Sequence, residues 1–298
     1  MQIISELIAI VAPVILVAGA GFLWVKLKRP FDHEMLTALV TNIGTPFLLF
    51  TILTRLVISP QALGQIMLGA ILCGLGFAVI GVIALRLMHL PNHSYLPALI
   101  FPNCGNLGLP LCYFAFGDVG LALAIGVFTI ASLAQFTLGV ALAAGHWSLA
   151  RLLRTPIIYA LIVAFAFILL DVKPPLWLAN TTKLLGDMTI PLMLVALGAS
   201  LAQLSVQRLP RALILSLVRL VGGFAVGVGV ATALGALMGL EPVARGVLIL
   251  QASMPVAVFN YLFAARYKRE PADIAGMVVL TTAISVLSAP LILLMVLP

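Results

Sequence analysis

The sequence predicts an all-α integral membrane protein of ten transmembrane helices in two inverted five-helix repeats. Three observations support this fold class. Of the 298 residues, 63% are hydrophobic and 8% are charged, whereas a soluble domain carries roughly 25% charged residues. Apolar segments of membrane-spanning length recur along the whole chain and leave no stretch for a large soluble domain. Prolines recur at matched positions in the two halves.

The apolar segments are separated by short polar or proline-containing breaks. A spanning helix needs about 20 apolar residues, so 298 residues accommodate roughly ten spans with their connections. The predicted helices cover residues 4–25, 35–57, 62–88, 95–116, 119–144, 154–171, 176–203, 209–239, 243–265 and 272–297. The fourth and ninth are the least regular, because proline, glycine or asparagine interrupts each of them at mid-span. The run at residues 7–25 is too long for a signal-peptide core and is predicted to be the first span.

Basic residues concentrate in every second loop. Three lie beside the even-numbered loops, namely Arg55, Lys173 and Arg245. Eleven lie in or beside the odd-numbered loops: Lys26, Lys28, Arg29, Arg86, Arg151, Arg154, Arg208, Arg211, Arg266, Lys268 and Arg269. Because loops rich in lysine and arginine remain cytoplasmic, both termini are predicted to lie on the periplasmic or extracellular side of a bacterial inner membrane. The same bias accounts for the net charge of +7 without a nucleic-acid partner.

A shift of 145 residues relates the two halves of the chain. It places four of the eight prolines before residue 111 on prolines of the second half, where chance gives about 0.5. The pairs are Pro30 with Pro175, Pro46 with Pro191, Pro97 with Pro242, and Pro110 with Pro255. With five spans in each repeat, residues 148–298 are expected to lie inverted relative to residues 1–147. Inverted repeats with broken helices are typical of secondary transporters that bind their substrate at mid-membrane.

The fourth span cannot be a continuous helix. Residues 97–110 hold three prolines and two glycines, and each proline removes a backbone donor. Unpaired backbone at this depth is tolerated only inside protein or beside a wet cavity. Asn103 and Asn106 can supply hydrogen bonds, and Asn106 is expected to cap the restarted helix, whose N-terminus favours an anion. Ordinary proline kinks are the alternative interpretation.

The ninth span repeats this pattern from Gln251 to Asn260. Ser253 is expected to be the N-cap of a restarted helix and Pro255 to lie in its first turn. Because the halves are inverted, the two breaks are expected to cross at mid-membrane. Three polar side chains are candidates either for the wall of a pocket or for bonds between helices: Gln135, Asn260 and Thr129.

Two stretches of this sequence resemble the auxin efflux carrier family. They are FPNCGNLGLPLCYFAFG (101–117) and LQASMPVAVFNYLFAARY (250–267), which a last apolar span follows. The family includes bacterial permeases for malonate- and malate-type acids and the plant PIN auxin exporters. The resemblance implies that helices 4 and 9 cross at a proline and that the protein is a homodimer. It also implies a scaffold of helices 1, 2, 6 and 7, against which helices 3–5 and 8–10 move in an elevator-like way.

By the same resemblance, the substrate carboxylate lies at the crossover. The implied binding residues are Asn103, Cys104, Gly105, Asn106, Gln251, Ser253 and Pro255. The implied crossover or hinge residues are Pro102, Gly108, Pro110 and Pro255. The chain lacks the long central loop of the plant exporters, since only residues 146–154 join its halves.

Three charged residues fall inside predicted spans. Asp187 lies near the middle of the seventh span with Lys183 one turn earlier, and Arg219 lies deep in the eighth. Ionisable groups at such depth are functional candidates, so Asp187 is a candidate carrier of a coupled proton. The alternative is an internal ion pair of Asp187 with Lys183 or with Arg219.

The expected function is secondary active or facilitative transport of a small organic anion, a mono- or dicarboxylate. Coupling to H⁺ or Na⁺ stays open. A cation-coupled carrier of the bile-acid symporter or sodium–proton antiporter type is the alternative, which acidic residues at the breaks would favour, and neither break has one.

Other classes of function are disfavoured. A membrane enzyme would need paired aspartates, a histidine-rich metal set or a serine–histidine pair, and no span centre provides them. The chain has no GxxxxGK[ST] motif for nucleotide-driven pumping. Its three cysteines lack CxxC spacing, so no zinc site or disulfide framework is expected. We therefore expect no cofactor or metal, and as partners the transported anion and membrane lipid.

Overall fold

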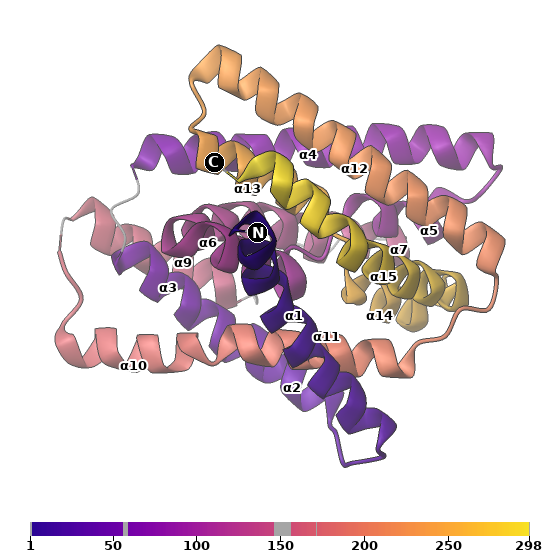
Figure 1. Ribbon diagram of the computed structural model, residues 1–298, viewed down its shortest axis with the longest axis horizontal. Helices are drawn as coiled ribbons and strands as arrows, with labels where there is room; N and C mark the ends of the chain where they lie inside the picture. Colours follow the sequence, from indigo (N-terminus) through magenta and orange to yellow (C-terminus); the bar gives the residue numbers. More distant parts are fainter. Residues whose placement is uncertain (1, 56–58, 146–155, 171, 298) are drawn as a thin grey trace.

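The computed structural model describes residues 2–55, 59–145, 156–170 and 172–297. This part of the chain is helical, and its one isolated β-bridge belongs to no named strand. Figure 1 shows the long helices α4 (Pro60–Leu87) and α12 (Leu209–Met238) together along one edge of the molecule. The helices α10 (Leu176–Asp187) and α11 (Thr189–Gln203) follow each other along the opposite edge.

The other elements include three short π-helical segments. In chain order they are α1 (Gln2–Lys26), α2 (His33–Leu39), η1 (Val40–Gly44), α3 (Thr45–Arg55), α5 (Asn92–Ile100), η2 (Cys104–Gly108), α6 (Leu109–Ala134), η3 (Gln135–Gly139), α7 (Val140–Ala144), α9 (Pro156–Leu169), α13 (Pro242–Ala252), α14 (Val258–Tyr267) and α15 (Pro271–Val296). Where the ends of the predicted spans are described, they agree with these bounds to within three residues.

Seven helical segments of the described chain are long and apolar enough to cross a membrane. The protein is therefore a multi-pass membrane protein. Two shorter apolar helices, Pro156–Phe167 and Pro242–Ala252, lie within the predicted sixth and ninth spans. The longest segment, Cys104–Ala144, has 41 residues. It is divided at Gly117, where φ is 64° and ψ is −155°, so the predicted fourth and fifth spans meet at this residue.

The helices pack in two sets. In the first, α1 packs against α11, and α3 packs against α9 and α10. In the second, α12 packs against α4, α13 and α15, and α6 packs against α4 and α13. Glycine permits a close approach within the first set, because a Cβ at Gly21 would collide with the carbonyl of Val195, and one at Gly198 with that of Ala18. Small residues are the usual means by which membrane helices approach so closely.

The 145-residue shift matches some prolines in structure but not others. Pro46 and Pro191 each lie in the first turn of a helix that follows an interruption, α3 and α11 respectively. Pro110 lies in the first turn of α6, whereas Pro255 lies in the non-helical segment between α13 and α14. Pro110 and Pro255 therefore do not occupy equivalent structural positions, because one lies inside a restarted helix and the other lies before one.

Several predicted features fall outside the described residues. They are the basic Arg151 and Arg154, the central connection at 146–154, and the boundary between residues 147 and 148. The three cysteines are all described, and each is a buried free thiol.

The substitution Gly117→Ala is expected to destabilise the fold. The φ and ψ of Gly117 lie in a region that essentially only glycine adopts, at a cost of about 1–3 kcal/mol for another residue. A Cβ there meets no atom within 4 Å, so the cost comes from the backbone. Thermal unfolding in detergent should show a lower midpoint.

The control is Gly64→Ala on α4, where a Cβ also meets no atom within 4 Å. This helical position should be neutral or slightly stabilised by alanine. Equal midpoints for Gly117→Ala and wild type would contradict the prediction.

Candidate functional site

The interruptions of the predicted fourth and ninth spans lie against each other. The helix α5 ends at Ile100, and α13 ends at Ala252. Before each helix restarts, a short non-helical segment intervenes, and an antiparallel β-bridge joins Pro102 to Val256. Two segments about 150 residues apart in sequence therefore form one structural junction.

Backbone hydrogen bonds hold this junction on both sides of the bridge. The N–H of Asn103 donates to the carbonyl of Pro255 at 2.7 Å, and the N–H of Ala257 donates to that of Phe101 at 3.2 Å. The side chain of Asn260 adds a second donor to the Phe101 carbonyl, with Nδ2 at 3.0 Å. Polar backbone that a helix break would leave unpaired in the membrane is thus satisfied within the protein.

Asn103, and not Asn106, caps the first restarted helix. Its Oδ1 accepts a hydrogen bond from the backbone N–H of Asn106 at 3.2 Å, and η2 begins at the next residue, Cys104. The carbonyl of Asn103 also accepts from the N–H of Gly108 at 3.1 Å. The predicted cap was wrong because the helix restarts directly after the bridge, one turn earlier than expected.

Ser253 does not begin the second restarted helix. It follows the last residue of α13, and its Oγ donates to the carbonyl of Ile249 at 2.7 Å. The helix α14 begins at Val258, with Ala257 as its N-cap. The predicted N-cap at Ser253 and the placement of Pro255 in the first turn were wrong, because the chain remains non-helical long enough to pair with the first interruption.

The buried guanidinium of Arg219 bonds the carbonyl ends of both interrupted helices. It donates to the carbonyl of Leu99 at 3.4 Å, to that of Ala252 at 2.8 Å and to that of Met254 at 3.2 Å. Its Cζ lies 4.4 Å from the centre of the Phe77 ring. A cation is favourable at a helix C-terminus, and Arg219 serves two such ends at once.

Asp187 pairs with Lys183 and not with Arg219. The Asp187 carboxylate accepts from the ammonium group one turn earlier, and the two side chains are 59% and 50% exposed. Asp187 is the last residue of α10. The pair therefore lies on the surface of the described chain, and neither residue lines the cavities discussed below.

A small cavity lies beside the first interruption, and we call it the polar cavity because six of its eighteen lining residues carry an amide or hydroxyl group. Its volume is about 40 Å³, little more than the roughly 30 Å³ that one water occupies in the liquid. Its walls come from η1, α3, α9 and α11 on one side, and from η2, α6, η3 and α14 on the other. Polar side chains on these walls are Thr41, Thr45, Asn103, Asn106, Ser132 and Gln135. The cavity thus lies between the two packing sets.

Each of the three π-helical segments contributes to this cavity. Thr41 comes from η1, Asn106 from η2 and Gln135 from η3. Each of these five-residue segments ends in glycine, as VTNIG, CGNLG and QFTLG. A π-turn carries one more residue than an α-turn, and such turns are frequent at functional sites.

Two buried side-chain amides near the junction lack hydrogen-bond partners in the described chain. They are Nδ2 of Asn103 and both polar atoms of Gln251. Asn103 lines the polar cavity, whereas Gln251 is fully buried against Gly108, at which a Cβ would collide with its amide. Leaving a buried polar group unpaired costs about 1–3 kcal/mol, so such groups in native structures call for an explanation such as a ligand or water.

The structure distributes the predicted site residues among three places. On the wall of the polar cavity lie Pro102, Asn103, Cys104, Gly105 and Asn106. Six others lie at the junction but off the wall of this cavity, namely Gly108, Pro110, Arg219, Gln251, Ser253 and Pro255. Away from it lie Lys183 and Asp187. The three further polar candidates lie in different places. Gln135 lines the polar cavity, and its Nε2 donates to Oδ1 of Asn260 at 3.3 Å. Thr129 is buried but does not line this cavity.

Comparison with known proteins identifies the family. The family model described as "Membrane transport protein" matches residues 140–293, which is more than half of the chain. The chain belongs to the auxin efflux carrier family of membrane transport proteins. An uncharacterized transporter of Methanocaldococcus jannaschii is 26% identical over 301 residues, covering 95% of each chain. The resemblance inferred from residues 101–117 and 250–267 is thereby confirmed.

Three polar residues in the cavity of this membrane transporter were not predicted from sequence: Thr41, Thr45 and Ser132. Each is a single hydroxyl in an apolar segment, where such residues often serve only to bond neighbouring helices. Helical spacing was the available signal. Thr41 and Thr45 are four residues apart, and Ser132 lies three residues before Gln135, so each pair shares one helix face.

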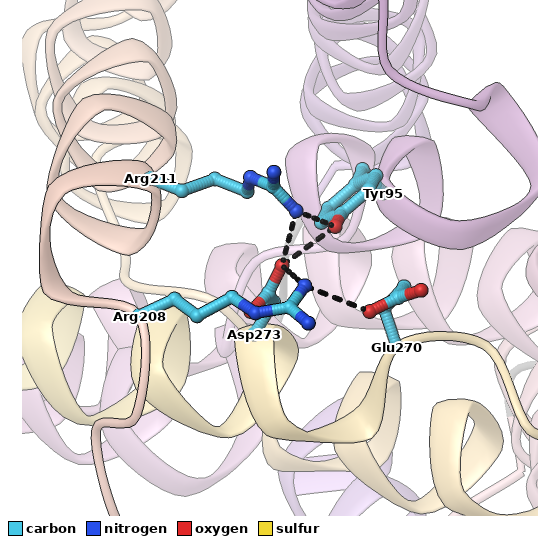
Figure 2. A network of polar contacts seen from close by, with 5 residues as sticks. All are labelled: Tyr95, Arg208, Arg211, Glu270 and Asp273. Carbon is cyan, nitrogen blue, oxygen red and sulfur yellow. Dashed lines mark hydrogen bonds and ion pairs between the residues drawn. The ribbon is translucent and has the colours of Figure 1, made fainter.

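A polar network around the buried carboxylate of Asp273 was also not predicted for this transporter (Figure 2). The Oδ2 of Asp273 accepts from the hydroxyl of Tyr95 at 2.6 Å and from Arg211 at 3.1 Å, although its side chain is fully buried. Arg208 lies 3.6 Å from Asp273 and 3.3 Å from Glu270. Arg208 and Arg211 were predicted only as determinants of orientation. The network joins the first turns of α5, α12 and α15.

Replacing Arg219 by methionine is expected to destabilise this transporter. The substitution leaves three carbonyl groups at the junction without their donor, and each unsatisfied group costs about 1–3 kcal/mol. Arg219→Lys keeps the charge but cannot reproduce the fork of donors. Its midpoint of thermal unfolding should therefore fall between those of the wild type and Arg219→Met. Thermal unfolding in detergent measures all three proteins.

The matched control is Arg245→Met. Arg245 donates to a single carbonyl, that of Leu240, at 2.9 Å. Its loss should lower the midpoint less than the loss of Arg219. A larger effect at Arg245 would show that Arg219 does not hold the junction.

Proposed function

We propose that this protein transports a small organic anion, a mono- or dicarboxylate, by secondary active or facilitative transport. The observation that carries the proposal is the unpartnered Nδ2 of Asn103, which is buried on the polar cavity at the start of a restarted helix. An amide donor beside a helix N-terminus favours a carboxylate. Of the described residues that line this cavity, none is charged, so neutral donors would hold the anion.

The position of the cavity supports an elevator-like mechanism. We propose ten spans in two inverted repeats, with α1–α3 and α9–α11 as the scaffold and α4–α7 and α12–α15 as the moving core. The cavity has walls from both sets, so their relative movement would alter access to it. Arg219 and the Asp273 network support motion of the core as a unit, since together they connect α5, α12, α13 and α15.

The size of the cavity indicates which conformation the transporter adopts in this structure. Ligand pockets commonly measure about 300–1,000 Å³, and this cavity measures about 40 Å³. We infer that it is a contracted, occluded site, which separation of the two sets would widen. A cation-coupled carrier would instead call for carboxylates on these walls, and the described lining residues include none.

A panel of mono- and dicarboxylates tests the substrate class by thermal shift in detergent. At least one acid should stabilise the wild-type protein, and Asn103→Asp should abolish that stabilisation. The aspartate retains the oxygen that caps η2 but replaces the free donor with negative charge. Because a hydrogen bond to a charged group contributes about 1.5–3 kcal/mol, binding should weaken at least about tenfold.

Asn42→Asp serves as the matched control, because Asn42 is an exposed amide of η1 that does not line the polar cavity. It should bind the acid as wild type does. Stabilisation by sodium alone, with no response to any acid, would favour the cation-coupled alternative instead.

The role of Asp187 is tested separately in proteoliposomes. Its carboxylate is paired with Lys183 outside the polar cavity, so Asp187→Asn should leave the pH dependence of uptake unchanged. Lys183→Gln, which removes the other partner, should behave in the same way. If Asp187→Asn alone abolished the pH dependence, Asp187 would be the carrier of a coupled proton.

A further inference from the structure

A larger cavity lies among the helices of the second packing set. Its volume is about 670 Å³, and α4, α6 and α7 form its sides. Residues of α5, α13 and the first interruption also line it. Pro102 and Cys104 line both this cavity and the polar one, so the two share part of a wall.

Small residues create this cavity. Ala70, Gly74 and Ala78 follow one another at four-residue spacing on α4, and Ala131 and Ala134 lie on α6. Small residues usually let membrane helices approach closely, but here they border open space. A Cβ built on Gly74 meets no atom within 4 Å.

The chemistry of the walls is that of hydrocarbon. Every described residue on them is uncharged. The polar atoms of Gln251, the one amide side chain among them, are buried away from any accessible surface. A polar or charged occupant would find only the thiols of Cys73 and Cys104, which are weak hydrogen-bonding groups. An apolar occupant would gain dispersion contacts along its length.

Exposed apolar side chains surround the mouth. Ile71 and Leu75 on α4 are 46% and 60% exposed, and Leu138 in η3 is 45% exposed. Both α4 and the segment Cys104–Ala144 are long and apolar enough to cross a membrane. The mouth therefore opens onto the hydrocarbon core of the bilayer and not onto water. Inner residues such as Phe101 are buried, at 3% exposed.

We propose that an acyl chain of a membrane phospholipid occupies this cavity. It enters between α4 and η3, fills the space left by the small residues, and reaches the first interruption at Pro102 and Cys104. Hydrocarbon chains are the solvent at the mouth, so entry requires no transfer from water. Through the shared wall, the chain supports the residues that line the polar cavity. The assignment does not depend on which anion the protein transports.

Quenching by brominated lipid tests the proposal in nanodiscs. The native tryptophans are first replaced by phenylalanine: Trp24, Trp147 and Trp177. Phe101→Trp then places a reporter at the inner end of the cavity. In phosphatidylcholine brominated near the chain ends, its emission should fall relative to unbrominated lipid. The control reporter Phe50→Trp, equally buried at 5% exposed and on no cavity wall described here, should keep its emission.

Cavity-filling substitutions make the test specific. Adding Gly74→Phe to the Phe101→Trp protein should restore the emission, because the new ring takes the place of the acyl chain. Gly64→Phe on the same helix, where a Cβ likewise meets no atom and which lies off the cavity wall, should leave quenching intact. If Phe101→Trp does not yield a folded protein, Leu142→Trp on the same wall replaces it as reporter.

Two results would overturn the proposal. One is an equal fall in emission for the cavity and control reporters when brominated lipid replaces unbrominated lipid. The other is quenching that Gly74→Phe leaves unchanged but that a transported acid relieves, which would assign the cavity to the apolar part of the substrate.

Discussion

The pairing of two helix interruptions across a single antiparallel bridge is the interaction on which the rest of this structure depends. Within a membrane, a broken helix exposes backbone groups that lipid cannot bond. Here the segments around Pro102 and Val256 satisfy each other, and Arg219 supplies donors to the carbonyls that remain. Each break is stable because the other is present, so the two have to form together.

This constraint determines the chemistry available to a transported molecule. The residue that starts the first restarted helix, Asn103, uses its backbone for the bridge and its Oδ1 for the cap. Only its Nδ2 remains for a ligand. Around it, hydroxyl and amide groups of both packing sets replace charged side chains. The anion proposed as the substrate would be bound through oriented dipoles, without a buried ion pair whose desolvation would be costly.

Hydropathy predicted the helical segments well, because each span must be apolar along its length whatever its partners are. Proline and glycine likewise predicted where helices stop. Where they restart depends on tertiary pairing, and so the caps assigned to Asn106 and Ser253 were wrong. Long-range partners could not be predicted either, because nothing local in the sequence connects Arg219 with the carbonyl of Leu99, or Tyr95 with Asp273. Cavity residues with a hydroxyl group, such as Thr45, were not predicted for the same reason.

The π-helical segments give the cavity walls a geometric property that straight helices lack. A π-turn holds one residue more than an α-turn. At 3.6 residues per turn, one extra residue turns the side chains that follow it by about 100° relative to an uninterrupted α-helix. Thr41, Asn106 and Gln135 each lie in one of these segments. The helix faces before and after each segment therefore differ in direction, so one helix can present a polar side chain to the cavity at the π-turn and an apolar face to its neighbours beyond it.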